Sequence, residues 1–173
     1  LGASASLGFP DPAYNYGRML EVMLTQARPD LDFEVVNVSM TAINSHVVRL
    51  IAKDCARYEP DFFIVYLGNN EVVGPYGPGS VFSDSMPPRA TIHASQALRS
   101  TRLGQLLGNT LSAIADPDQE KKPQAWGGME MFLDRTVTAT DPALKTVNDN
   151  FHANLSDICE TALDVGAQVI LST

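Results

Sequence analysis

Basic residues are scarce in this chain, and their scarcity narrows the range of partners. The 12 lysines and arginines are outnumbered by 20 aspartates and glutamates, so the formal net charge of the 173 residues is -8. Nucleic acid and anionic membrane surfaces repel a protein of this charge. The composition therefore argues against either as the main partner.

Cysteine is equally scarce, and long apolar runs are missing. Cys55 and Cys159 fall in helical patterns without the spacing of metal ligands, so we expect two buried free thiols rather than a disulfide. The chain has no run of about 18 apolar residues and no signal peptide, which argues against a membrane-spanning helix. It begins at Leu1 without a methionine and ends in an apolar, strand-like run, so we expect both ends to be cut from a longer protein.

The most informative stretch is a short apolar run at residues 62–67. Six consecutive apolar residues are too few for a helix and too uniform for a half-exposed strand. They predict a strand buried on both faces of a parallel sheet. Gly68, Asn69, Asn70 and Glu71 follow directly. Open α/β sheets bind ligands outside the carboxyl ends of their strands, so these residues predict a functional edge.

The rest of the chain alternates helix and strand patterns. Helices are expected over about residues 13–27 and 45–58 and from Pro142 to a C-cap at Gly166, and strands over residues 33–38 and 168–172. Strands joined by helices through short connections indicate right-handed parallel crossovers. The sequence therefore predicts one α/β domain over residues 1–173.

Residues from about 74 to 141 break this alternation and form a predicted insertion. Its first part is rich in proline and glycine, residues 95–115 resume a helical pattern, and residues 126–132 form a compact apolar patch. Long insertions in compact domains are usually functional or disordered, and the apolar content favours order. Two interpretations stay open: the insertion covers the functional edge, or Trp126, Met129 and Phe132 pack its helix onto the body.

Three loops are expected at the carboxyl edge of the sheet, at residues 2–8, 37–42 and 68–71. Acyl transfer needs a nucleophile and hydrogen-bond donors aimed at the oxyanion of the tetrahedral intermediate. Ser4 is the candidate nucleophile. Its backbone N–H, the backbone N–H of Ala42 and the side-chain amide of Asn70 are the candidate donors. Ser4 alone is typical of a turn or helix cap, but the other two loops favour the nucleophile.

These loops resemble the first three sequence blocks of the SGNH (GDSL-like) hydrolase superfamily, in order and at compatible spacings. The resemblance implies a three-layer, flavodoxin-like sandwich and hydrolysis of a small-molecule or glycan ester. It makes Ser4 the nucleophile and Ser4, Ala42 and Asn70 the oxyanion hole, and this chemistry needs no metal or organic cofactor. The blocks are Gly2-Ala3-Ser4-Ala5-Ser6-Leu7-Gly8, Asn37-Val38-Ser39-Met40-Thr41-Ala42 and Gly68-Asn69-Asn70-Glu71.

A narrower similarity lies in the third block and the insertion. The form Leu67-Gly68-Asn69-Asn70-Glu71, followed by a long insertion with an apolar patch, is similar to SGNH domains of larger bacterial proteins with tetratricopeptide repeats. This similarity implies a protein that is exported or membrane-tethered. It also implies protein partners bound through regions outside this segment.

The chain departs from the family pattern at three positions. Ala3 stands where the family has an acidic residue, Ala42 where it has a glycine, and Glu71 where it has an aspartate. If position 42 requires a positive φ, alanine costs about 1 kcal/mol of strain. The Asp-x-x-His block that supplies the family's base follows its last strand and would lie beyond Thr173.

The three histidines of the chain are not assigned to that role. Asp149 and His152 have the residue types and spacing of the Asp-x-x-His block. They fall in the middle of a predicted helix, however, where a solvated side-chain pair is the simpler interpretation. His46 is expected on the surface of its helix. His93 lies in the insertion and is left unassigned.

Two classes of function follow. The first is a serine ester hydrolase that forms an acyl-enzyme on Ser4. The alternative is a ligand-binding or glycan-binding domain on the same fold without catalysis, which Ala3, Ala42 and the missing base favour. Nucleotide binding is a weaker third class, because the first loop lacks the Gly-x-Gly-x-x-Gly order and no lysine follows it.

Overall fold

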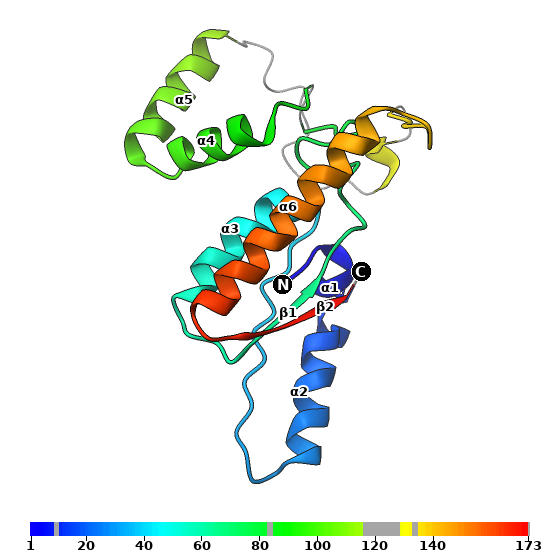
Figure 1. Cartoon of the computed structure of the whole chain (residues 1–173), viewed down its shortest axis with the longest axis vertical. Helices are drawn as coiled ribbons and strands as arrows, with labels where there is room; N and C mark the ends of the chain where they lie inside the picture. Colours follow the sequence, from blue (N-terminus) through cyan, green and yellow to red (C-terminus); the bar gives the residue numbers. More distant parts are fainter. Residues whose placement is uncertain (9–10, 83–84, 116–128, 133–134, 173) are drawn as a thin grey trace.

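The chain forms a mixed α/β structure in a computed structural model that describes residues 1–8, 11–82, 85–115, 129–132 and 135–172 (Figure 1). The three helices predicted outside the insertion and the strand at residues 168–172 are confirmed, with small shifts at their ends. The elements are α1 (Ser4–Leu7), η1 (Pro12–Tyr14), α2 (Tyr16–Ala27), α3 (Ser45–Ala56), β1 (Phe62–Tyr66), α4 (Arg89–Arg99), α5 (Arg102–Ala115), η3 (Met129–Phe132), α6 (Ala143–Asp164) and β2 (Gln168–Ser172).

The sheet of the described residues is parallel and has two strands, β1 and β2. β1 pairs with β2 in a register that places Phe62 opposite Gln168. On the other edge of β1, the Leu1 amino group donates to Ile64 O at 2.7 Å and Tyr66 N donates to Leu1 O at 3.0 Å. The backbone N–H and C=O groups of a strand point alternately to its two edges. One edge of β1 bonds to β2 and the other to Leu1, so β1 lies between residues 1–2 and β2.

Helices α3 and α6 pack side by side over one face of this sheet (Figure 1). Small residues at their contact, such as Ala52 and Ala162, let the two helix backbones approach closely, and both are fully buried. Glycine ends α6 as predicted, because Gly166 has a φ of 80° just after the last helical turn. The core also contains Val48, Phe63, Val65, Leu67 and Ile158.

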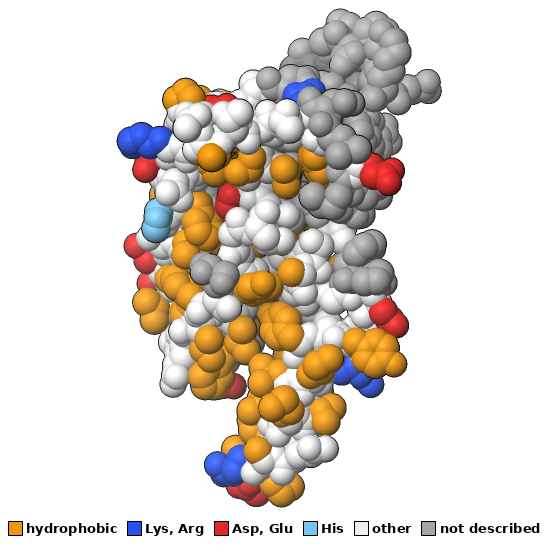
Figure 2. All heavy atoms as spheres, turned by 90° about the vertical axis from the view of Figure 1, so that its right-hand side faces the viewer, with side chains coloured by type: hydrophobic (Ala, Val, Ile, Leu, Met, Phe, Trp, Pro, Cys, Tyr) orange, Lys and Arg blue, Asp and Glu red, His pale blue; other side chains and the backbone are white. Residues whose placement is uncertain are grey.

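The prediction that both faces of the 62–67 strand are buried is wrong for the described part of the chain. Phe63 and Val65 are 3% and 1% exposed, whereas Phe62 and Tyr66 are 53% and 37% exposed. The reason is that α3 and α6 cover one face, while α2 extends away from the sheet (Figure 1). Hydrophobic side chains gather in the lower part of the space-filling view, where α2 lies (Figure 2).

The predicted strand at residues 33–38 is not formed, since the backbone there is irregular. Residues 1–2 lie near the end of this segment and offer only a short edge for pairing. Just beyond the segment, Met40 N donates a long hydrogen bond to Gly2 O at 3.4 Å. A strand needs a partner edge to satisfy its backbone. Within this unpaired segment, the side chain of Val36 is exposed to solvent.

The described part of the insertion contains two α-helices where one helical pattern was predicted. Helix α4 begins at Arg89, before the expected start at residue 95, and a turn at Ser100 and Thr101 separates it from α5. Phe132 is buried and makes an edge contact with Phe82, with ring centroids 6.3 Å apart. Trp126 lies outside the described residues, so the two interpretations of the apolar patch stay predictions.

The two cysteines are free, as expected, but only half-buried. Burial raises the pKa of both the Cys55 and the Cys159 thiols. Both groups are therefore poor nucleophiles at neutral pH, because the thiolate is the reactive form.

Candidate functional site

Side-chain hydrogen bonds join the third predicted loop and the residues after it to Ile43 and Asn44, which directly follow the second loop. Asn70 Nδ2 donates to Ile43 O at 3.0 Å, directly beside Ala42. The turn that carries Asn70 begins at Gly68, whose φ of 125° is accessible to glycine. Asn44 donates through its side chain to Pro75 O at 2.8 Å, so the loop after β1 is fastened at two points.

The first loop reaches the same end of β1. Gly2 forms a parallel bridge with Tyr66, the last residue of β1, and α1 begins two residues later at Ser4. Asn37 Nδ2 donates to Ser6 O at 2.9 Å and so ties the second loop to the first. The three predicted loops therefore gather at the carboxyl end of β1, while the catalytic roles of Ser4, Ala42 and Asn70 stay predictions.

The two serines of the first loop differ in their surroundings. Ser6 is fully buried, and its hydroxyl donates to Tyr66 O at 3.4 Å, so its oxygen is held against the sheet. Ser4 is half-buried at the first position of α1, and its hydroxyl has no hydrogen-bond partner in the described part of the chain. Of the two, Ser4 is the more exposed.

Ala42 has the left-handed backbone that the family's glycine suggested, with a φ of 60°. A side chain with a Cβ is strained in this region, because the Cβ approaches the following carbonyl oxygen. The strain of about 1 kcal/mol that alanine causes at a positive φ therefore applies to residue 42.

Replacing Ala42 with glycine is expected to raise the free energy of unfolding by about 0.5–1 kcal/mol, because relief of strain exceeds the added entropy of the unfolded chain. Urea denaturation of both proteins measures the difference. Ala94→Gly, in the exposed interior of α4, is the matched control and should lower the stability by about 1 kcal/mol. A loss of stability in Ala42→Gly would show that residue 42 is not strained.

Glu71 anchors the third loop to the start of α3. Its carboxylate accepts hydrogen bonds from Ser45 N at 2.9 Å and from Ser45 Oγ at 2.7 Å. Asn44 occupies the N-cap position but makes no side-chain cap, so Glu71 satisfies the helix end from a distant part of the chain. Burial raises the pKa of Glu71 above its usual value, although both hydrogen bonds from Ser45 oppose this shift.

A buried asparagine of α6 extends this anchor into the protein. Asn154 is fully buried and donates to Ser45 Oγ at 3.0 Å and to His46 Nδ1 at 3.1 Å. Its oxygen accepts from Arg89 Nε at 2.9 Å, at the start of α4. Sequence reasoning missed Ser45, Asn154 and Arg89, because residues 45 and 154 are separated by 109 positions and share no short motif.

The prediction that His46 lies on the surface is wrong. His46 is only 5% exposed, because α6 and the loop after β1 cover the first turn of α3, and its ring makes an edge contact with Tyr76 at 5.7 Å. Burial lowers the pKa of His46 to about 4, with further lowering from His93, Arg89 and Arg49. The imidazole is therefore neutral at pH 7, and its Nδ1 accepts the hydrogen bond from Asn154.

The Asp149 and His152 pair has the environment expected for a solvated helix face. Both side chains are exposed, and Asp149 forms an ion pair with Lys145 at 2.7 Å. Lys145 and Asp149 are one helical turn apart, a spacing that commonly gives such pairs. The contacts of Asp149 thus give no support to a catalytic role for this pair.

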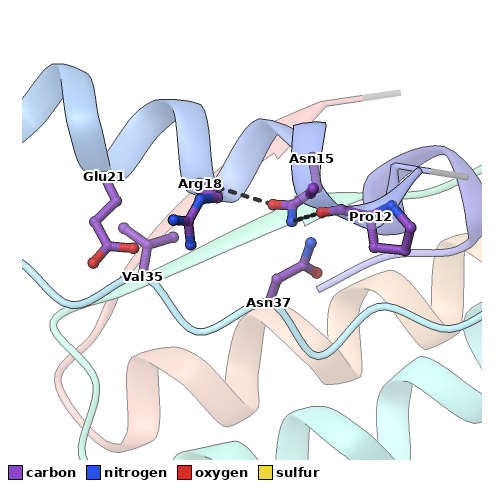
Figure 3. A pocket seen from close by; sticks show the side chains of 7 residues that line it. Pro12, Asn15, Arg18, Glu21, Val35 and Asn37 are labelled. Carbon is purple, nitrogen blue, oxygen red and sulfur yellow. Dashed lines mark hydrogen bonds between the residues drawn. The ribbon is translucent and has the colours of Figure 1, made fainter.

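A shallow pocket lies beside the first loop, between η1, α2 and the irregular segment before Asn37 (Figure 3). Its volume is about 320 Å³. Asn37 connects the pocket to the first loop through its bond to Ser6, but Ser4, Ala42 and Asn70 are not among the lining residues. The lining residues are Pro12, Ala13, Asn15, Arg18, Glu21, Val35 and Asn37.

Neither a metal-binding cluster nor a membrane-spanning helix is present in the described parts of the chain. Within those residues, no group of three or more histidine, cysteine, aspartate or glutamate side chains is arranged to hold a metal ion. None of the helices described is both long and apolar enough to cross a membrane.

Comparison of the chain with protein-family models, with curated proteins and with solved structures gives no match.

Proposed function

We propose that the protein is a serine-dependent ester hydrolase on a three-layer, flavodoxin-like fold. The observation that carries the proposal is the convergence of three separate loops at the carboxyl end of β1, fastened by the bonds from Asn37 to Ser6 and from Asn70 to Ile43. The fold is supported by the central place of β1 between residues 1–2 and β2. The likeness of these loops to SGNH sequence blocks supports the chemistry.

In this proposal the Ser4 hydroxyl attacks the ester carbonyl, and its proton passes to a histidine outside this segment. The carbonyl oxygen becomes an oxyanion, which accepts hydrogen bonds from Ser4 N–H, Ala42 N–H and the Asn70 amide. Collapse of the intermediate releases the alcohol, which takes up the proton, and leaves an acyl group on Ser4. Water then attacks the acyl-enzyme and releases the carboxylic acid.

The contacts of Asn70 suit a rigid donor. One N–H of its amide group is bonded to Ile43 O, which leaves the second N–H for the oxyanion. The next residue, Glu71, is held by two hydrogen bonds to Ser45 at the start of a 12-residue helix. Such support from neighbouring bonds keeps a catalytic side chain in place before the substrate arrives.

A fluorophosphonate probe tests the proposed nucleophile in the full-length protein. We expect a covalent adduct on Ser4, detected by mass spectrometry of the digested protein, and no adduct in Ser4→Ala. Ser6→Ala is the matched control and should keep the adduct, because the Ser6 hydroxyl is buried against Tyr66. An unlabelled wild-type protein, or equal labelling of Ser4→Ala, would contradict the proposal.

The second candidate is a ligand-binding or glycan-binding domain without catalysis. Strain at Ala42 favours it, since a φ of 60° without glycine can shift the N–H that would serve as donor. This candidate predicts that an acetylated oligosaccharide binds to the unlabelled protein and is recovered intact, whereas the hydrolase would release acetate.

A further inference from the structure

Helices α4 and α5 form a tight hairpin within the insertion. Thr101 Oγ1 accepts a hydrogen bond from Gly104 N at 3.0 Å and so caps the first turn of α5. Gly104 is buried against α4, and a Cβ there would overlap the carbonyl group of Leu98. The hairpin is therefore built for close contact between its own two helices.

Helix α4 is fixed to the body by polar contacts along its length, and we call it the base of the hairpin. Arg89 donates to Asp157 at 2.6 Å and to Asn154 at 2.9 Å, both on α6. Gln96 donates to His46 O at 3.1 Å on α3. From this base the hairpin extends away from the sheet, with α5 on its outer side (Figure 1).

Large apolar side chains on the hairpin face solvent. Leu103, Leu106 and Leu107 follow helical spacing on α5 and are 73%, 61% and 54% exposed. Leu98 of α4 is 55% exposed. Leu98 lies against Gly104 of α5, the residue after Leu103, so the leucines of the two helices lie near one another on the hairpin. We call these four residues the leucine surface.

The charge of the hairpin is opposite to that of the whole chain. Residues 85–115 contain three arginines and no aspartate or glutamate, whereas the chain has a net charge of -8. Arg89 forms an ion pair with Asp157 of α6. Arg99 and Arg102 are exposed near the turn between the two helices. A leucine-rich surface with arginines beside it is complementary to the interface of an anionic bilayer.

We propose that the α4–α5 hairpin docks on the surface of an anionic lipid bilayer. The leucine surface enters the boundary between headgroups and acyl chains, and Arg99 and Arg102 contact lipid phosphates. The net charge of the chain argues against such a surface as the main partner, but residues 85–115 carry only basic charged residues and would supply the attraction locally. This inference is independent of the proposed ester hydrolysis.

Vesicle flotation of the full-length protein tests the proposal at low ionic strength. We expect binding to mixed phosphatidylcholine–phosphatidylglycerol vesicles, weaker binding at high salt, and little binding to phosphatidylcholine alone. Arg99→Gln/Arg102→Gln should lower the partition coefficient by about tenfold or more, and Leu103→Ser/Leu106→Ser/Leu107→Ser should lower it at least as much. Far-UV circular dichroism checks that each variant is folded.

Matched controls separate this surface from other exposed groups. Met19→Ser/Val22→Ser/Met23→Ser removes exposed apolar side chains of α2, and Arg28→Gln/Arg57→Gln removes exposed arginines of the body. Both should keep full binding. Absence of binding to the mixed vesicles, or equal losses in the control variants, would overturn the proposal. So would a wild-type dimer that the leucine variant converts to a monomer, since the surface would then bind a second copy.

Discussion

Replacing Asn70 with alanine is expected to lower kcat for hydrolysis of nitrophenyl acetate by about 10²–10³-fold in the full-length protein. The amide of Asn70 is the proposed side-chain donor to the oxyanion, and that charge develops only as the transition state forms. Loss of such a donor lowers kcat and leaves KM nearly unchanged. Steady-state kinetics of the purified variant measure both constants.

Asn69→Ala is the matched control for this experiment. Asn69 is the neighbouring residue of the same turn, and its side chain is exposed. Its replacement should change kcat by less than about threefold, in keeping with surface substitutions elsewhere. Equal losses in the two variants would indicate a general disturbance of the turn. An unchanged kcat in Asn70→Ala would remove the side chain from the oxyanion hole.

Replacing Asn154 with alanine is expected to lower the free energy of unfolding by about 3 kcal/mol. Asn154 is fully buried and makes hydrogen bonds with Ser45, His46 and Arg89. Alanine leaves a cavity and leaves buried polar atoms such as His46 Nδ1 without a donor. Guanidinium denaturation measures the loss, and the melting temperature should fall by about 10 °C.

Asn148→Ala provides the control on the same helix. Asn148 is exposed, so the same substitution there removes no buried contact and should change the stability by less than about 0.5 kcal/mol. If the two variants are equally stable, the network around Asn154 contributes little to the folded state. The comparison removes the contribution of helix propensity, because both changes are asparagine to alanine in α6.

Asn154 also connects the insertion with the candidate site through hydrogen bonds. Arg89 of α4 bonds to Asn154, Asn154 bonds to Ser45, and Ser45 bonds to Glu71 beside Asn70. The base of the hairpin and the third loop thus share one chain of hydrogen bonds. Removal of Asn154 breaks this chain at its centre, which is why we expect a large effect from a residue far from Asn70 in sequence.

Much of the framework could be predicted from local patterns. The apolar stripes of α3 and α6, the stop at Gly166 and the turn at Gly68 all depend on residues a few positions apart, and the structure has them near the expected places. The irregular segment at residues 33–38 could not be predicted in this way. A strand requires an edge to pair with, and the β-branched pattern of the segment says nothing about whether one is available.

The sequence by itself determined the α/β character, the helices outside the insertion and the order of the three polar loops, because helical spacing and turn residues act over short distances along the chain. Tertiary structure decided which face of β1 is covered, why His46 is buried and neutral, and how Asn154 joins Ser45 to Arg89. These features depend on contacts between α3, α4 and α6, and no local spacing encodes which remote helix supplies the missing hydrogen bond.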